Sequence, residues 1–471
     1  MTTSPNPAER ATASPYPERV AESLHPDCPD LSRLGPTPAD ALLRAKAARA
    51  EHDDERRTSI WSRGFTRRRL IAGAGMVGVA GIGSQLVTTR VSFAAPDPET
   101  QAATNTLVVI FLRGGQDGLS ILVPGADEHL TGARPNIRVP AGALVPLTRG
   151  FGMHPALEPL RGYWNAGTFS MVPALSTPDL SRSHFQAQDC LERGGRSSTS
   201  ITSGWLDRTL TELGAGTTFR AISESTTLPR ALVGPSNAIA MTGIDSFKLS
   251  VGAATRARTT EALERLYTGF THPLRTQALT TLHALDAAAR IQSTPYTPGE
   301  GYPNNSFSKS LQDIARLIKS NAGLRVACVD LGGWDMHTGL GTIDTGDMQR
   351  LLKPLGQALA AFAKDLGSAL GRTTVLTMTE FGRRLRENAS GGLDHGHGSV
   401  AMLMGGGLKP KSIAGAWPGL APDVLVSGDV PGSNDFRDLL GEVLVKRFGL
   451  TTANLGRIFP DHSYRALGAF A

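Results

Sequence analysis

The sequence predicts an α/β fold in which helices cover both faces of a mainly parallel sheet. Three observations predict it: one long apolar run, several shorter strand-like runs, and helical patterns between them. The long run is Thr106–Leu112, TLVVIFL, whose unbroken apolar and β-branched character is typical of a strand buried on both faces. The chain has 471 residues, 40% of them hydrophobic, which is enough for one large domain with insertions.

Strand-like and helical segments alternate along the rest of the chain. Further strand candidates are the runs at residues 168–174, 324–331, 373–379 and 400–404. Helical patterns occur at residues 156–164, 259–291, 308–320 and 348–370. This alternation is typical of a three-layer αβα domain, which we expect over residues 104–471. Residues 197–250 are less regular and are a possible insertion, and residues 293–308, rich in Pro, Gly and Asn, are expected to form a loop.

The N-terminal region has the pattern of an export signal. Residues 1–65 are rich in Pro, Ala and charge without a sustained apolar face, which predicts disorder. Arg67 and Arg68 then directly precede an uncharged, glycine-interrupted stretch, and small residues end the segment at Ala94. Residues 66–94 therefore resemble a twin-arginine (Tat) signal peptide, and the alternative is an uncleaved membrane anchor with the same topology.

The expected location follows from this signal. We expect the protein to use the Tat translocase as a partner during export and to work in the periplasm, the cell wall or outside the cell. Membrane contact is expected only through an uncleaved signal. Of the formal charge of +6, only about +3 belongs to residues after Ala94, and no basic cluster follows, so no nucleic-acid partner is predicted.

Cysteine is sparse in the predicted domain. Cys190 and Cys328 are the two cysteines after the signal. Buried free thiols are the simpler interpretation, and a single disulfide is the alternative, which the sequence alone does not exclude.

Acidic and histidine side chains follow the predicted strands. The first strand is followed by Asp117, the strand ending at residue 331 by Asp335 and His337, and the strand ending near residue 379 by Glu380. Ligands in open α/β sheets bind beyond the carboxyl ends of the strands, so these side chains are expected at one edge. The motif Asp394-His395-Gly396-His397-Gly398 precedes the next strand and is the most specific element.

A mixed set of carboxylates and imidazoles indicates a metal site. It suits Zn, Mn or Fe better than Ca or Mg, and one or two divalent ions are expected. Each residue alone has a simpler interpretation, since an Asp in a Gly-rich loop often forms an Asx-turn and a lone His often caps or packs. Arg113, followed by two glycines, could clamp an anion.

A serine at a predicted helix start is the candidate nucleophile. Ser183 and Gln186 fit a capping box, so Ser183 is expected to begin a helix that runs to about Glu192. The simpler interpretation is that Ser183 only caps this helix. A hydroxyl at a helix N-terminus is also well placed to become a nucleophile, because the helix dipole favours negative charge there.

These motifs, taken in order, resemble a large family of Tat-exported bacterial proteins with a domain of unknown function. The resemblance is carried by Asp117 after the first predicted strand, Ser183-His184, the segment from Trp334 to Gly339, the segment from Thr377 to Gly382, and the His-Gly-His motif. The family is placed in the alkaline phosphatase and sulfatase superfamily. The resemblance covers nearly all of the chain after residue 106 and implies an alkaline-phosphatase-like fold.

The resemblance also implies roles for single residues. It implies a metal-dependent hydrolase of phosphate or sulfate esters with an anionic ester as substrate. Ser183 matches the nucleophile, with His184 beside it. The implied metal ligands are Asp117, Asp335, His337, Glu380 and His395 or His397. Phe381 stands where the superfamily has a ligating histidine, and this departure leaves open a single metal, a changed ligand set, or a non-catalytic exported binding or assembly protein that keeps the fold.

Overall fold

A computed structural model gives the structure of the chain and describes residues 104–196, 201–236, 238–249, 251–268 and 275–471. The predicted disordered segment and the predicted signal peptide lie outside the described residues. The centre of the structure is an eight-stranded sheet with the order β11-β5-β10-β9-β1-β8-β6-β7. Its strands, in chain order, are β1 Thr106–Leu112, β5 Phe169–Ser176, β6 Ala221–Glu224, β7 Ile239–Met241, β8 Val326–Leu331, β9 Thr373–Met378, β10 Ser399–Gly405 and β11 Asn434–Asp435.

The sheet is mainly parallel, as the sequence predicts. Strand β1 pairs in parallel with β8 on one side and with β9 on the other. Within the described residues, every strand of this sheet runs in the same direction except β10, which is antiparallel to both β5 and β9. The amino end of β10 therefore lies at the same edge as the carboxyl ends of its neighbours.

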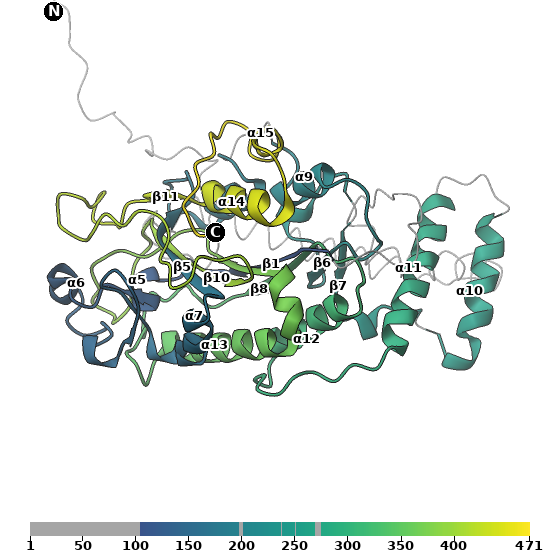
Figure 1. Cartoon of the computed structure of the whole chain (residues 1–471), viewed down its shortest axis with the longest axis horizontal. Helices are drawn as coiled ribbons and strands as arrows, with labels where there is room; N and C mark the ends of the chain where they lie inside the picture. Colours follow the sequence, from purple (N-terminus) through teal and green to yellow (C-terminus); the bar gives the residue numbers. More distant parts are fainter. Residues whose placement is uncertain (1–103, 197–200, 237, 250, 269–274) are drawn as a thin grey trace, which may run out of the picture. The chain divides into compact units, whose positions relative to one another are not determined.

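Two apolar layers cover the two faces of the sheet. Successive side chains of a strand point to opposite faces. Accordingly, Val108, Ile110 and Leu112 of β1 belong to one apolar cluster, with α12 (Ser306–Lys319) and α13 (Asp347–Leu366). Leu107, Val109 and Phe111 belong to the opposite cluster, with helices α9 Trp205–Glu212, α14 Phe436–Phe448 and α15 Thr452–Ile458. Figure 1 shows these two groups of helices on opposite sides of the strands, which confirms the three-layer architecture.

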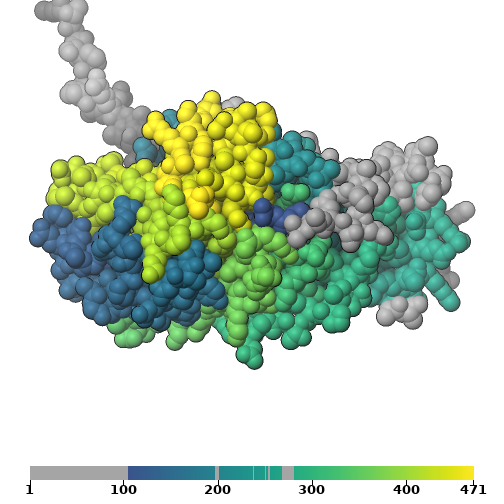
Figure 2. All heavy atoms as spheres, in the orientation of Figure 1, coloured from purple at the N-terminus to yellow at the C-terminus, as the bar shows by residue number. Residues whose placement is uncertain are grey.

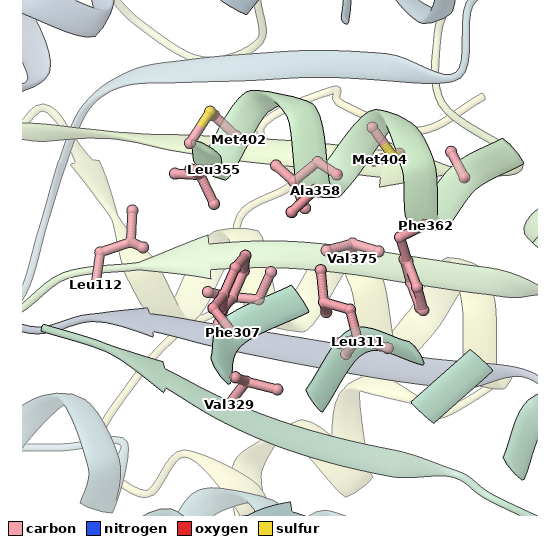
Figure 3. Close-up of a cluster of buried hydrophobic side chains, with 14 of the residues drawn as sticks. Leu112, Phe307, Leu311, Val329, Leu355, Ala358, Phe362, Val375, Met402 and Met404 are labelled. Carbon is pink, nitrogen blue, oxygen red and sulfur yellow. The ribbon is translucent and has the colours of Figure 1, made fainter. Parts of the chain in front are cut away.

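Helices α12 and α13 fasten the first layer to the sheet. Figure 3 shows their apolar side chains gathered against Val329 of β8 and Val375 of β9. The side chains that the helices contribute there are Phe307 and Leu311 from α12, with Leu355, Ala358 and Phe362 from α13. All of them are at most 5% exposed, and full burial of one such Leu or Phe side chain stabilises a fold by about 1.5–3 kcal/mol.

Segments distant in sequence meet in the second layer. In Figures 1 and 2, the teal helix α9 lies directly beside the yellow helix α15, and the two helices are in contact. The rings of Trp205 in α9 and Phe459, which follows α15, pack with their centroids 5.9 Å apart, a separation typical of aromatic pairs. The C-terminal part of the chain is thereby joined to the segment near residue 205.

The remaining elements are short helices, a small sheet and a helical pair. The small sheet has the order β2-β4-β3, formed by Leu122–Val123, Gly152–Met153 and Val145–Pro146. The predicted helix at 259–291 is two helices, α10 (Ala253–Thr268) and α11 (Arg275–Ser293). The other helices are α5 Gly118–Ile121, α6 Glu128–Ala133, α7 Arg161–Asn165 and α8 His184–Arg193, and the 3-10 helices are η2 Ala141–Ala143, η3 Pro155–Leu160, η4 Arg230–Leu232, η5 Ile244–Ser246 and η6 Gly367–Arg372.

The structure also bears on the predictions for residues 197–250 and for the two cysteines. The irregular region 197–250 contributes β6 and β7, which extend the central sheet beyond β8, and its being an insertion stays a prediction. Cys190 and Cys328 are both buried and free, so the simpler interpretation of the two thiols is confirmed. Among the described residues, none of the helices combines the length and apolar character needed to span a membrane.

Candidate metal centre

Five segments bring polar side chains to one edge of the central sheet. The chain leaves β1, β8, β9 and β5 at this edge and enters β10 there. Asp335 follows β8, Glu380 follows β9, and His395 precedes β10. His184 is the first residue of α8, which comes after β5. The topology therefore places four of the predicted site residues in neighbouring loops.

Three of these side chains converge on one point. The Nε2 atoms of His184 and His395 are 3.2 Å apart. A carboxylate oxygen of Asp335 lies 3.2 Å from Nε2 of His395, and its other oxygen lies 3.5 Å from Nε2 of His184. Within the described part of the chain, these three residues form the group of His, Cys, Asp or Glu side chains that could hold a metal ion, with ligand atoms within 4.8 Å of one another.

The spacing of this group fits an ion. Ligands that are about 2.0–2.2 Å from a metal at tetrahedral angles lie about 3.3–3.6 Å from one another. The separations of 3.2 Å between the two Nε2 atoms and between Nε2 of His395 and Oδ1 of Asp335 are close to this range, and Oδ2 of Asp335 is the oxygen at 3.5 Å from His184. Two imidazole nitrogens and a carboxylate are also the protein ligands of many catalytic metal sites. Such sites keep a further coordination position open for water or substrate. The residues present therefore fit a divalent ion.

His337 borders this group. Its Nε2 atom lies 2.9 Å from Nε2 of His395 and 3.0 Å from an oxygen of Asp335. No comparable contact joins it to His184 among the described interactions, and it is not part of the three-residue group. His337 is therefore a neighbour of the candidate ligands, placed to contact an additional ligand position or a second ion.

The outer nitrogen of each histidine has an acceptor. Nδ1 of His184 lies 2.8 Å from Oε1 of Glu380, and Nδ1 of His395 lies 2.9 Å from the carbonyl oxygen of Arg182. Such contacts fix the imidazole tautomer that directs the Nε2 lone pair inward, and they are typical of metal-ligating histidines. This arrangement is the strongest structural indication that the cluster is a metal centre.

Glu380 contacts Nδ1 of His184, the nitrogen that faces away from the candidate metal position. Its side chain is 1% exposed, and Oε1 accepts hydrogen bonds from the Gly114 amide at 2.8 Å and from Nε2 of Gln188 at 3.0 Å. Burial raises the pKa of this carboxyl, but the contacts with His184 and Gln188 outweigh burial and lower the pKa to about 2. Glu380 is thus ionised and positioned to orient His184, whereas the sequence predicted it as a metal ligand.

We expect Glu380→Gln to weaken metal binding by about 10- to 100-fold, because loss of an outer carboxylate partner typically has this effect. The amide still fills the space of the carboxylate but no longer carries its charge toward Nδ1 of His184. Titration of the metal-free variant with Zn²⁺ measures the change. Unaltered affinity would show that Glu380 does not support the ligand.

The protonation of the cluster makes metal binding dependent on pH. Burial raises the pKa of the Asp335 carboxyl, but hydrogen bonds from the three histidines and the charge of Arg383 hold it well below its ordinary value. Burial lowers the pKa of His184, but Asp335 and Glu380 outweigh burial and raise it from 6.5 to about 9. In the metal-free protein His184 is therefore protonated near neutral pH, and a metal ion must displace that proton.

Arg383 forms an ion pair with Asp335, and the sequence did not predict it as a site residue. Its side chain is 0% exposed and donates to Asp335 Oδ1 at 2.5 Å. It also donates to the carbonyl oxygens of Gly115 at 2.6 Å and Leu393 at 3.0 Å. With its donors directed to these acceptors, Arg383 fixes the loops after β1 and β8 together and orients Asp335.

Asp117, which the sequence predicts as a metal ligand, is paired with Arg134. Its two carboxylate oxygens accept hydrogen bonds from Arg134 at 2.5 and 2.9 Å, and both side chains are at most 2% exposed. One of these oxygens also caps α5 by accepting from the Ser120 amide. Arg134 further donates to the carbonyl oxygens of Arg384 and Leu385. The pair therefore braces the segment that carries Arg383 and lies outside the three-residue group.

Arg113 and His397 also lie outside the three-residue group. Arg113 forms ion pairs with Glu192 at 2.6 Å and Asp330 at 3.1 Å, so its guanidinium is engaged by two carboxylates. Burial lowers the pKa of His397, and the charges that act on it are those of Asp429, Arg182 and Asp179. An anion clamp at Arg113 and metal ligation by His397 stay predictions.

Ser183 occupies the predicted helix start without forming the predicted capping bond. It is the N-cap residue of α8, which ends at Arg193 near the predicted end. Its side chain makes no capping hydrogen bond, so the capping box with Gln186 is wrong. The hydroxyl oxygen is buried and has no hydrogen-bond partner among the described residues. A buried polar atom without a partner costs stability, which is more easily explained if a ligand contacts it.

Phe381 packs against the histidines. Its ring centroid lies 4.8 Å from those of both His184 and His395, and the residue is 3% exposed. The ring leaves no room for a side chain at Gly115, where an added Cβ would lie 2.4 Å from it. The aromatic side chain therefore packs against both candidate histidine ligands and against the backbone of Gly115.

Solved structures with similar architecture share little sequence with this chain. One is a putative sulfatase from Bacteroides thetaiotaomicron, with 12% identity, coverage of 78% of this chain and 76% of that one, and a TM-score of 0.30. A second is a protein in the alkaline phosphatase superfamily from Vibrio parahaemolyticus, with 12% identity, 78% and 72% coverage and a TM-score of 0.33. A third is the C-terminal periplasmic domain of EcEptC from Escherichia coli in complex with Zn, with 10% identity, 66% and 77% coverage and a TM-score of 0.32.

Sequence comparison identifies the family. No curated protein matches the sequence. The family model described as "Protein of unknown function (DUF1501)" matches residues 168–446, which is more than half of the chain and includes His184, Asp335 and His395. The chain therefore belongs to the DUF1501 family of proteins of unknown function.

Proposed function

We propose that this protein is an exported, metal-dependent hydrolase of phosphate or sulfate esters, with Ser183 as nucleophile. The observation that carries the proposal is the convergence of His184, Asp335 and His395, each imidazole fixed from behind, beside a serine whose buried hydroxyl has no partner. A divalent ion held there supplies Lewis-acid polarisation of an ester oxygen and favours the ionised hydroxyl.

Each of these side chains has a separate role in the proposed reaction. Ser183 Oγ forms a bond to phosphorus or sulfur while the bond to the alcohol oxygen breaks, and the alcohol leaves with a proton. Water then breaks the seryl ester, which releases the inorganic anion and restores the hydroxyl. The N-terminus of the ten-residue helix α8 favours negative charge at Ser183 during both steps. Glu380 and Arg383 keep His184 and Asp335 in position.

The decisive test of Ser183 is its replacement by alanine. Since no capping bond is lost, Ser183→Ala should change stability by less than the ~1 kcal/mol typical of a cap. Turnover of the best ester found in a broad panel should fall by at least about 10³-fold, because the nucleophile is gone. Metal content, measured in parallel, should stay at the wild-type value.

Ser308→Ala is a matched control for this experiment. Ser308 is also a buried serine near a helix start whose hydroxyl has no partner among the described residues, but it belongs to α12. Its replacement should leave turnover unchanged. Full activity of Ser183→Ala with metal retained would assign the attack to water instead. Bound metal with no turnover of any ester by the wild-type protein would favour a non-catalytic binding role.

Export through the Tat route is part of the proposal. It rests on the twin arginines before a weakly hydrophobic, uncharged stretch. Changing Arg67 and Arg68 together to Lys keeps the positive charge but should stop recognition, so the protein should accumulate in the cytoplasmic fraction. The same Lys substitution at Arg56 and Arg57, which lie farther from the apolar stretch, should leave export intact. Undiminished export of the Arg67→Lys, Arg68→Lys protein would reject the Tat assignment.

A further inference from the structure

We infer that the site prefers esters whose alcohol carries an alkyl or aryl group, which contacts an apolar lip formed by Leu180 and Phe185. The inference rests on the proposed function and specifies its substrate class. Leu180 is 72% exposed and Phe185 is 46% exposed. Both flank the candidate ligand His184 in sequence, Phe185 directly and Leu180 four residues before it.

Exposed large apolar side chains are few in the described part of the chain. Besides the apolar lip, they are Val233, Leu266 and Val426. Two of the five therefore fall within six residues, on either side of a candidate metal ligand and of the candidate nucleophile. Single exposed apolar residues need no explanation, but their concentration at a reactive site indicates contact with an apolar group.

The segment that presents Leu180 is tied to the metal centre. Arg182 accepts a hydrogen bond through its carbonyl oxygen from Nδ1 of His395, and its guanidinium pairs with Asp429 at 2.5 Å. Asp179 accepts from the Ser181 amide at 3.0 Å, which closes the turn that contains Leu180. The exposure of Leu180 is therefore a property of a bonded turn, held by the same contact that orients a candidate ligand.

Charge beside the apolar lip fits the other end of such a substrate. Arg182 and Arg384 both pair with Asp429, whose side chain is 3% exposed, so the three groups together leave one positive charge. The two arginine side chains are 35% and 38% exposed and are accessible to an anion. The anionic ester group of such a substrate would match the two arginines, and its apolar alcohol would match the apolar lip.

Alkyl phosphates and alkyl sulfates of increasing chain length test the inference. Ethyl, butyl, hexyl and octyl esters have nearly equal leaving-group reactivity and differ mainly in apolar area. If the chain contacts the apolar lip, kcat/KM of the metal-loaded protein should rise at least about tenfold from butyl to octyl, since a fully buried methylene contributes about fourfold. In the Leu180→Ser, Phe185→Ser double variant, the octyl-to-butyl ratio should fall to about one.

Leu266→Ser is the matched control. Leu266 is 50% exposed on α10, and its replacement should leave both turnover and the octyl-to-butyl ratio unchanged. A wild-type ratio near one, with clear turnover, would overturn the inference and leave the hydrolase proposal intact. A ratio that persists in the double variant would also overturn it.

A binding measurement separates the two proposals. Butyl and octyl phosphonates resist hydrolysis, so their affinities for the metal-loaded protein do not depend on catalysis. At least about tenfold tighter binding of octyl phosphonate, lost in the double variant, would support the apolar lip even if no ester is turned over. Equal affinities would overturn it.

Discussion

We expect Asp335→Ala to remove both the bound metal and the proposed activity. Asp335 is the carboxylate of the three-residue group, and its oxygens contact His184 and His395 at 3.5 and 3.2 Å. Without it, two imidazoles remain near the positive charge of Arg383. Metal affinity should fall by more than the ~10- to 100-fold expected for an outer partner, and turnover by at least about 10³-fold.

The effect of Asp335→Ala can be separated from unfolding. Asp335→Asn keeps the size of the side chain and can still accept a hydrogen bond from Arg383, so thermal stability should be nearly wild-type while metal is lost. His397→Ala is a matched control, because His397 lies in the same His-Gly-His motif but outside the three-residue group. It should keep the metal, whereas His395→Ala should lose it. Retention of metal by Asp335→Asn would contradict the proposed ligand set.

The largest expected effect on stability comes from Arg134→Ala. Arg134 and Asp117 are 1% and 2% exposed and form two hydrogen bonds. Removal of one partner leaves an uncompensated buried charge, which typically costs about 3–5 kcal/mol of unfolding free energy. Chemical denaturation followed by circular dichroism measures this cost.

The double variant makes the prediction sharper. Asp117→Ala, Arg134→Ala has no unpaired charge and should be more stable than Arg134→Ala alone. Asp117→Asn, if folded, should keep a full complement of metal, because the oxygens of Asp117 are engaged by Arg134. A double variant no more stable than Arg134→Ala would contradict the role of the pair. Loss of metal in folded Asp117→Asn would restore the ligand role that the sequence predicted.

The main features of the fold could be predicted from the sequence because its strands are strongly patterned. The run Thr106–Leu112 is apolar on both sides, as a central strand between two helical layers requires, and all seven residues are buried. The helical pattern at 259–291 was predicted as one element although Gly269 and Pro273 interrupt it, and the structure has two helices there, α10 and α11. Strands β6 and β7 are four and three residues long, which is too short for periodicity to distinguish.

The candidate site could be predicted only in outline. The position of these residues directly after strands indicated the correct edge of the sheet. Ion pairs with other side chains, which the sequence does not show, decide which of them can bind a ligand. Arg134 and Arg383 were missed because an arginine is usually exposed, and sequence does not show that these two are buried against Asp117 and Asp335. The two-residue spacing of the His-Gly-His motif would place both histidines on one face of an extended segment, so spacing alone did not show that the structure brings His395 and not His397 into the three-residue group.

The most direct test of the metal centre is anomalous X-ray scattering from a crystal of the purified protein. Data collected above and below the absorption edge of the metal found by elemental analysis locate the ion without assumptions about its ligands. We expect one anomalous peak per chain, about 2.0–2.2 Å from Nε2 of His184, Nε2 of His395 and an oxygen of Asp335. A stoichiometric metal located elsewhere, or no metal in a protein purified without chelator, would contradict the proposed centre.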